Sequence, residues 1–137
     1  MSEISLEALH LAVQAVEDAL NDYHYAEETQ LRLLLSVRDG AIQRFESAMD
    51  LSRKLILRVL KEKFALDDIA ANNKTFIREG ARFGLIADAE AWMRHLEARN
   101  RTSHTYDAQL AEQVFAKIPA FLPDARDLLV RLNDAIA

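Results

Sequence analysis

Apolar residues recur along this chain at the three- and four-residue spacing of α-helices, and few residues interrupt that spacing. The chain has three Gly and two Pro in 137 residues, which leaves little room for the turns between β-strands. Near the N-terminus, one apolar stripe on a helix of about 3.6 residues per turn is formed by Leu6, Leu9, Val13, Val16 and Leu20. We therefore predict an all-α fold. A chain of 137 residues can bury one core but not two, so we expect a single domain over residues 1–137.

The first two predicted helices follow this apolar pattern closely. Ser5 can cap the start of the first helix, and the pattern is interrupted at residues 21–25, where we expect a helix end or turn. The second helical segment runs from about Glu27 to Lys63, and Asp39-Gly40 is expected to kink it or divide it in two because Gly weakens a helix. Its 3-4-3-4-3 spacing indicates near-antiparallel packing in a bundle.

A polar connection at residues 66–74 comes next, and shorter helical segments are predicted after it. Thr75 is the predicted cap of a third helix, and Gly84 is expected to end it in the left-handed conformation that Gly adopts at low cost. Asp88 is the predicted cap of a fourth helix.

The last predicted helix begins at Asp107. Pro119 lacks a backbone N–H and should kink this helix, and Pro123 should mark its restart.

The composition excludes several classes of protein. The chain has no Cys, so it has neither disulfides nor thiolate metal sites, and this suggests a cytoplasmic protein. We expect no signal peptide, because the N-terminus lacks a basic region followed by an apolar run. No apolar run approaches the roughly 20 residues of a membrane span, so we also expect no membrane partner. The net charge of −5 argues against broad, sequence-independent binding of nucleic acid but leaves room for a local basic site.

Residues 99–107, with the sequence Arg-Asn-Arg-Thr-Ser-His-Thr-Tyr-Asp, concentrate the polar chemistry of the chain. Arg99 offers a planar fork that matches phosphate oxygens, and His104 can transfer protons near neutral pH. Together they suit cleavage of RNA by its own 2′-hydroxyl, with His104 moving the proton and Arg99 stabilising charge at phosphorus. Arg94 and Arg101 add local positive potential. This chemistry requires no metal.

Helix geometry limits how Arg99 and His104 can cooperate. On an unbroken helix, five residues turn the chain by roughly 500°, so the two side chains would point about 140° apart. To meet at one phosphate they need a helix break, for which Thr102-Ser103 is a candidate, or a second subunit related by a twofold axis.

Structural roles compete with this catalytic interpretation. Arg99 could form a surface ion pair with Glu97 or Asp107, and His104 could cap a helix. Tyr106 could belong to the core. The Arg-to-His spacing by itself also occurs often by chance.

Glu7 and His10 have the Glu-x-x-His spacing of di-iron helical bundles. Such a site needs two copies of this motif and two further Glu residues, whereas the chain has one copy, placed off the first apolar stripe. Surface residues are the favoured interpretation. We predict no metal site and no cofactor.

Four further features are given structural interpretations. Glu46 and Asp50 lie four residues apart on the second helix and could both face a cleft, but solvated surface is the favoured interpretation. Trp92 is assigned to the core, with base stacking as a less favoured role. His24, between two Tyr residues, is placed in a structured turn. His95 is expected at the surface or beside the RNA site.

Residues 99–107 resemble the signature of the HEPN superfamily. Within it, they are most similar to the small proteins encoded beside minimal nucleotidyltransferases, known as nucleotidyltransferase substrate-binding proteins or HepT-type toxins. Residues 37–46 resemble the second-helix block of this family, and residues 76–86 with Trp92 resemble the block that leads into the motif. Together these segments cover most of residues 37–107.

The resemblance implies an up-and-down four-helix bundle, here with one kinked or extra short helix, that forms a homodimer with the motif at or near the interface. It implies that Arg99 and His104 are catalytic in a metal-independent ribonuclease, and it favours Glu46 as an internal partner of Arg99 or Arg38. The implied contacts to phosphate or RNA are Asn100, Arg101, Ser103 and Arg94.

The resemblance also implies the partners. A cognate minimal nucleotidyltransferase would silence the toxin by attaching AMP to Tyr106, and the RNA substrate could be a structured RNA such as tRNA. Two alternatives remain open: a non-catalytic substrate-binding subunit of a two-component nucleotidyltransferase, and a purely structural helical dimer. One position departs from the family pattern, since Arg53 stands where the second helix usually carries Trp; this affects local packing or a dimer contact rather than the motif.

Overall fold

The structure, a computed structural model, describes residues 3–26, 31–66, 74–104 and 106–137. Within these residues it is all-α, as predicted. The elements are α1 (Glu7–Ala26), α2 (Leu31–Phe64), α3 (Thr75–Arg82), α4 (Ala89–Arg101), the 3-10 turn η1 (Thr102–His104) and α5 (Ala108–Ile136). None of the helices in this described part is both long enough and apolar enough to cross a membrane.

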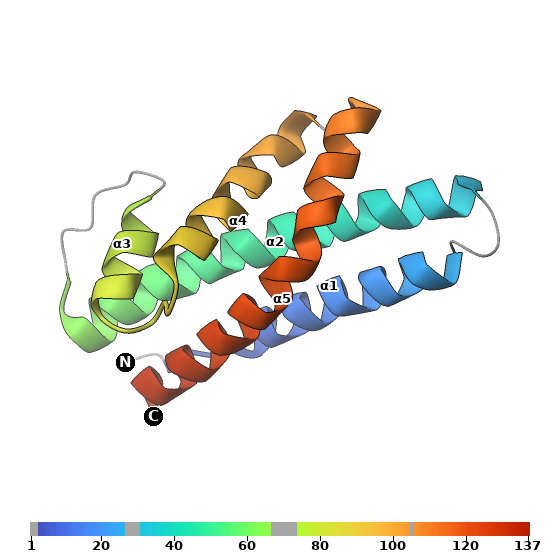
Figure 1. The fold of residues 1–137 in the computed structure, drawn as a ribbon. Helices are drawn as coiled ribbons and strands as arrows, with labels where there is room; N and C mark the ends of the chain where they lie inside the picture. Colours follow the sequence, from blue (N-terminus) through green and yellow to red (C-terminus); the bar gives the residue numbers. More distant parts are fainter. Residues whose placement is uncertain (1–2, 27–30, 67–73, 105) are drawn as a thin grey trace.

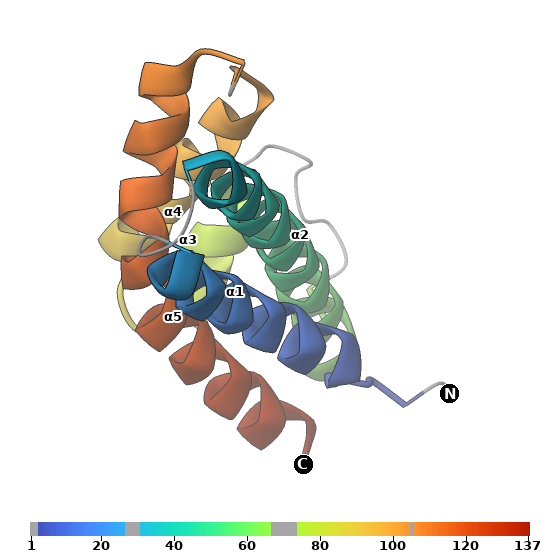
Figure 2. The same cartoon turned by 90° about the vertical axis from the view of Figure 1, so that its right-hand side faces the viewer.

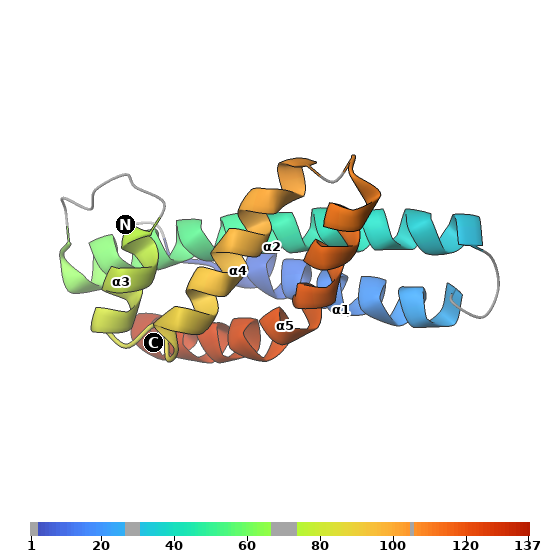
Figure 3. The ribbon, with the colours of Figure 1, turned by 45° about the horizontal axis from the view of Figure 1, so that its top comes forward.

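Four long helices form the bundle. The antiparallel helices α1 and α2 lie side by side, and α5 packs against both of them (Figure 1). The view in Figure 2 looks along α1 and α2 and separates them from α4, which lies beside the upper part of α5. Helix α4 contacts both α5 and α2, while the short helix α3 covers one end of α2 (Figure 3). The prediction of a helical bundle with one extra short helix is therefore confirmed.

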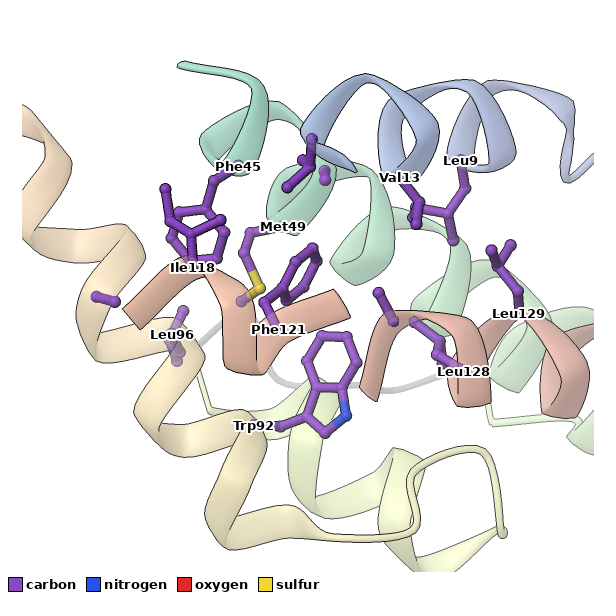
Figure 4. Packing of buried hydrophobic residues seen from close by; sticks show 14 of the residues in the cluster. Leu9, Val13, Phe45, Met49, Trp92, Leu96, Ile118, Phe121, Leu128 and Leu129 are labelled. Atoms are coloured by element: carbon purple, nitrogen blue, oxygen red, sulfur yellow. The ribbon is translucent and has the colours of Figure 1, made fainter. Parts of the chain in front are cut away.

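The core is built from the apolar stripes that the spacing predicts. Leu9 and Val13 of α1 point towards α5, and Trp92 of α4 lies beside Phe121 (Figure 4). Phe121 is at the centre of an aromatic cluster, with ring centroids 5.1 Å from Phe45 and 5.8 Å from Trp92, both in edge-on orientation. The assignment of Trp92 to the core is confirmed, and this cluster joins α2, α4 and α5.

Several predicted helix ends are confirmed by their hydrogen bonds. The Ser5 hydroxyl accepts a bond from the Glu7 N–H (3.3 Å), and the Asp88 carboxylate accepts one from the Ala91 N–H (3.1 Å). Gly84 has φ +80° and follows α3, so it occupies the left-handed region as expected.

Two other helix boundaries were predicted less exactly. Helix α1 ends at Ala26, so the helix end expected near residues 21–25 is confirmed, and there Tyr23 packs against Phe115 of α5 with ring centroids 4.4 Å apart. This tertiary contact outweighs the polar local sequence. The placement of His24 in a structured turn is wrong, because it lies exposed in the last turn of this helix. Thr75 is the first residue of α3 rather than its cap, which is Lys74.

The two long helices are also less divided than expected. Helix α2 is continuous through Asp39 and Gly40, so the predicted break is wrong. Helix α5 contains both Pro119 and Pro123 without an interruption, so it does not restart at Pro123. It does bend between its upper and lower parts (Figure 1), as a proline inside a helix requires. The predicted start of the second helix at Glu27 and residues 67–73 of the polar connection lie outside the described residues.

The environment of Gly40 leads to a stability prediction. A Cβ at Gly40 would meet nothing within 4 Å, and the residue lies inside α2. Gly40→Ala should therefore raise the free energy of unfolding by about 0.5–1 kcal/mol, because Ala restricts the unfolded chain and favours the helix. Urea denaturation measures this. Gly84→Ala serves as the opposite control and should destabilise, since its φ of +80° strains an Ala.

Candidate active site

The predicted helix break between Arg99 and His104 is present. Helix α4 ends at Arg101, and the chain continues as the single 3-10 turn η1, which His104 ends. Thr102 is buried at this junction, and its backbone N–H donates to the Arg99 carbonyl oxygen. The motif therefore spans the end of α4, and its side chains from Thr102 onward no longer follow α-helical spacing.

The ion-pair partners of Arg99 lie on α2. Its Nε and Nη2 donate to the two carboxylate oxygens of Asp50, at 2.8 and 3.0 Å, in a bidentate pair. Glu46 Oε2 lies 3.6 Å from Arg99 Nη1, so its predicted role as a partner of Arg99 is confirmed. The hydrogen bond to Asp50 raises the pKa of Arg99 above its ordinary value, with opposing desolvation and supporting charge from Asp50 and Glu46. The interpretation of Glu46 and Asp50 as merely solvated surface, and that of Arg99 as a partner of Glu97 or Asp107, are wrong.

The contacts of Arg99 leave part of its guanidinium for a ligand. An Arg side chain has five N–H donors. Asp50 accepts two of them, and Thr102 Oγ1 accepts one from Nη1 at 3.1 Å. One N–H on each terminal nitrogen has no hydrogen-bond partner among the described residues, and Glu46 lies 3.6 Å from Nη1. Asp50 and Thr102 thus orient Arg99 while leaving these two N–H groups for the oxygens of a ligand.

His104 and Tyr106 are both exposed at the same end of the bundle. Tyr106 has 88% of its surface accessible, so its interpretation as a core residue is wrong. The two rings lie edge-on with centroids 6.2 Å apart. His104 does not cap α5, because the Asp107 carboxylate accepts from the N–H groups of Gln109 and Leu110. No hydrogen bond joins His104 to Arg99 within the described part of one chain.

A groove of about 750 Å³ opens beside Arg99, between α2 and α4. Asn100 and Ser103 line it, so three of the predicted site residues share this surface. Arg101 instead pairs with Glu97 (2.7 Å) on the side of α4 that faces α5, and Arg94 is exposed outside the groove. The rest of the lining comes from both helices: Asp50, Arg53, Lys54, Leu57 and Leu96.

His95 is neither at the surface nor part of this groove, which corrects the prediction. It is 5% exposed, its Nε2 lies 2.6 Å from Asp124 Oδ2, and its ring packs edge-on against Trp92 and Phe121. A buried polar side chain needs such a partner. No local pattern predicts this pair, because Asp124 lies 29 residues away on α5.

Glu7 and His10 are exposed, as the surface interpretation requires. Among the described residues, no three His, Asp or Glu side chains gather in a way that could hold a metal ion.

Comparisons with known proteins define the class. The profile of the family described as "Nucleotidyltransferase substrate binding protein like" matches residues 4–134, and the chain belongs to this family. It is 44% identical over 96 residues to the "Probable ribonuclease HepT" of Haemophilus influenzae, a match that covers 69% of this chain and 66% of the relative. The resemblance to HepT-type proteins of the HEPN superfamily is therefore confirmed.

Solved structures agree with this assignment. The structure of HI0074 from Haemophilus influenzae superposes on this chain with a TM-score of 0.83 at 34% identity. The match covers 94% of this chain and 99% of HI0074, which is described as having the fold of a substrate binding domain of a nucleotidyltransferase. A protein from Thermus thermophilus superposes with a TM-score of 0.70 at 29% identity, covering 88% of this chain and 98% of that one.

Proposed function

We propose that this protein is a metal-independent ribonuclease toxin whose antitoxin is a cognate minimal nucleotidyltransferase. The observation that carries the proposal is the environment of Arg99. Helix α2 orients its guanidinium at a groove, and two of its N–H groups remain for a phosphate. The exposed His104 ends the 3-10 turn that follows α4. The similarity to a probable ribonuclease supports it.

In the proposed reaction, the 2′-hydroxyl of RNA attacks the adjacent phosphorus. His104 accepts the proton of that hydroxyl, the bond from phosphorus to the 5′-oxygen breaks, and the leaving oxygen receives the proton back. The products are a 2′,3′-cyclic phosphate and a free 5′-hydroxyl. Arg99 donates to the phosphate oxygens as negative charge develops on them. Because no hydrogen bond joins Arg99 to His104 in the described part of one chain, we expect a homodimer to bring residues of two motifs to one substrate.

The first test is cleavage of several RNAs, including tRNA, by purified protein with EDTA present. Mass spectrometry must first confirm that Tyr106 is unmodified. We expect cleavage that is insensitive to EDTA and ends in cyclic phosphates. Intact RNA from an unmodified, folded protein would defeat the proposal.

Tyr106 fits the modification step of this proposal because its phenol is exposed beside the His104 ring. Its oxygen would attack the α-phosphorus of ATP, forming a phosphodiester to AMP and releasing pyrophosphate. The added nucleotide would cover His104 and place an anion near Arg99, where it would compete with RNA phosphate.

We predict that the cognate nucleotidyltransferase adds AMP to the wild type but not to Tyr106→Phe. The variant should also keep its ribonuclease activity when the partner and ATP are present, whereas the wild type should lose it. Intact-mass measurement and RNA cleavage report the two effects. Tyr25→Phe is the matched control, since Tyr25 is 76% exposed on α1, a helix that does not pack against α4 or η1. AMP on Tyr106→Phe would exclude Tyr106 as the acceptor.

A second function, that of a non-catalytic substrate-binding subunit, is favoured by the description of HI0074 as a substrate binding domain. On this hypothesis the fork of Arg99 would hold the phosphate of a nucleotide for the partner's active site. Nucleotide binding by an unmodified protein that leaves every RNA intact would select this function over the ribonuclease.

A further inference from the structure

The groove between α2 and α4 has a cationic wall beyond Arg99. Arg53 and Lys54 line it three and four residues after Asp50, so they extend the same face of α2 by about one helical turn. The carboxylate of Asp50 is already bound by Arg99. Neither Arg53 nor Lys54 makes an ion pair with the described part of the chain. The wall therefore carries two positive charges that the groove does not neutralise.

Arg53 also has an unsatisfied donor. Its Nε is buried and has no hydrogen-bond partner in the described structure. A buried polar N–H without a partner costs free energy. In a chain of net charge −5, such a local pair of cations attracts anions to one place rather than to the whole surface.

The remaining lining suits a nucleotide. Leu57 and Leu96 form an apolar side on which a base or ribose can lie, and Asn100 and Ser103 supply an amide and a hydroxyl. The groove volume of about 750 Å³ lies within the range of small-ligand sites. A protein segment would need an acidic side chain to meet the cations, whereas every nucleotide of an RNA strand brings its own phosphate and base.

We propose that this groove is a second phosphate site, in which Arg53 and Lys54 bind the phosphodiester next to the one that is cut. The proposal rests on the ribonuclease function and deepens it, because it makes a single-stranded stretch of at least two phosphodiesters the preferred substrate. Arg53, which replaces the Trp expected from the family pattern, would then be a specificity-determining residue of this chain.

The test compares two substrates and two double variants. A dinucleotide has one phosphodiester and cannot reach the second site, whereas a longer single-stranded oligoribonucleotide can. In Arg53→Gln/Lys54→Gln, the KM for the longer RNA should rise about tenfold, with kcat nearly unchanged and the dinucleotide unaffected. RNA binding by this variant should also depend less on salt. The slope of the logarithm of the RNA-binding constant against log[salt] should fall in magnitude by about 0.7 for one lost phosphate contact.

Lys61→Gln/Lys63→Gln is the matched control, because it removes the same charge from exposed positions in the last turn of α2. It should leave the difference between the two substrates intact. Equal effects of the two double variants, or equal effects on the two substrates, would overturn the proposal. So would dissociation of a dimer by Arg53→Gln/Lys54→Gln, detected by light scattering, because the groove would then be an interface between copies.

A non-cleavable 2′-deoxy oligonucleotide separates this proposal from the ribonuclease function. If the wild type cuts no RNA, tighter binding of this probe by the wild type than by Arg53→Gln/Lys54→Gln still supports the phosphate site. Equal binding by both proteins overturns it.

Discussion

His104→Ala will reduce RNA cleavage by about 10²- to 10⁴-fold, the contribution typical of a positioned acid or base. His104 is exposed and ends η1, and its side chain takes no part in the core. Its removal should therefore change the free energy of unfolding by less than about 0.5 kcal/mol. Initial rates on one RNA, with thermal unfolding measured in parallel, separate the loss of chemistry from a loss of fold.

His10→Ala is the matched control for this experiment. His10 is also exposed, but it lies on α1, which does not pack against α4 or η1. Its variant should cleave RNA at the wild-type rate. Full activity in a folded His104→Ala protein would remove His104 from the chemistry and leave Arg99 as a phosphate-binding residue.

The sequence predicted the features that depend on local spacing. The apolar stripe that includes Leu9 and Val13 is buried, Trp92 is in the core, and Gly84 ends α3 in the left-handed region. The break after Arg101 was expected because the hydroxyls that follow compete for backbone hydrogen bonds. These features arise from interactions within one or two helical turns, and a single sequence contains that information.

The environment of the site depends on contacts between distant segments, which spacing does not encode. Asp50 binds Arg99, which lies 49 residues away in the sequence. Glu112 binds the buried Arg38, 74 residues away, and this hydrogen bond is the main reason that the pKa of Arg38 is raised. The resemblance directed attention to Glu46, although the bidentate partner of Arg99 is Asp50, one turn further along α2. Tertiary packing also supports the last turn of α1, where Tyr23 contacts Phe115 of α5.

The aromatic cluster around Phe121 joins α4 to α2 and α5. Phe121 is fully buried and is contacted by the rings of Phe45, Trp92 and His95. Phe121→Ala should lower the free energy of unfolding by about 3–5 kcal/mol, through lost apolar burial and the cavity left behind. Natural domains have about 5–15 kcal/mol in total, so this single change removes a large share. Urea denaturation followed by the fluorescence of Trp92 measures the loss.

Phe121→Leu and Tyr106→Ala are the control variants for this measurement. Leu refills much of the cavity and should recover more than half of the loss, whereas Tyr106→Ala removes an exposed ring and should change stability by less than about 0.5 kcal/mol. Because Trp92 and Arg99 lie on the same helix, a loosened cluster should also lower RNA cleavage before the protein unfolds. A Phe121→Ala protein of wild-type stability would mean that other contacts, such as those between α4 and α2, position the motif.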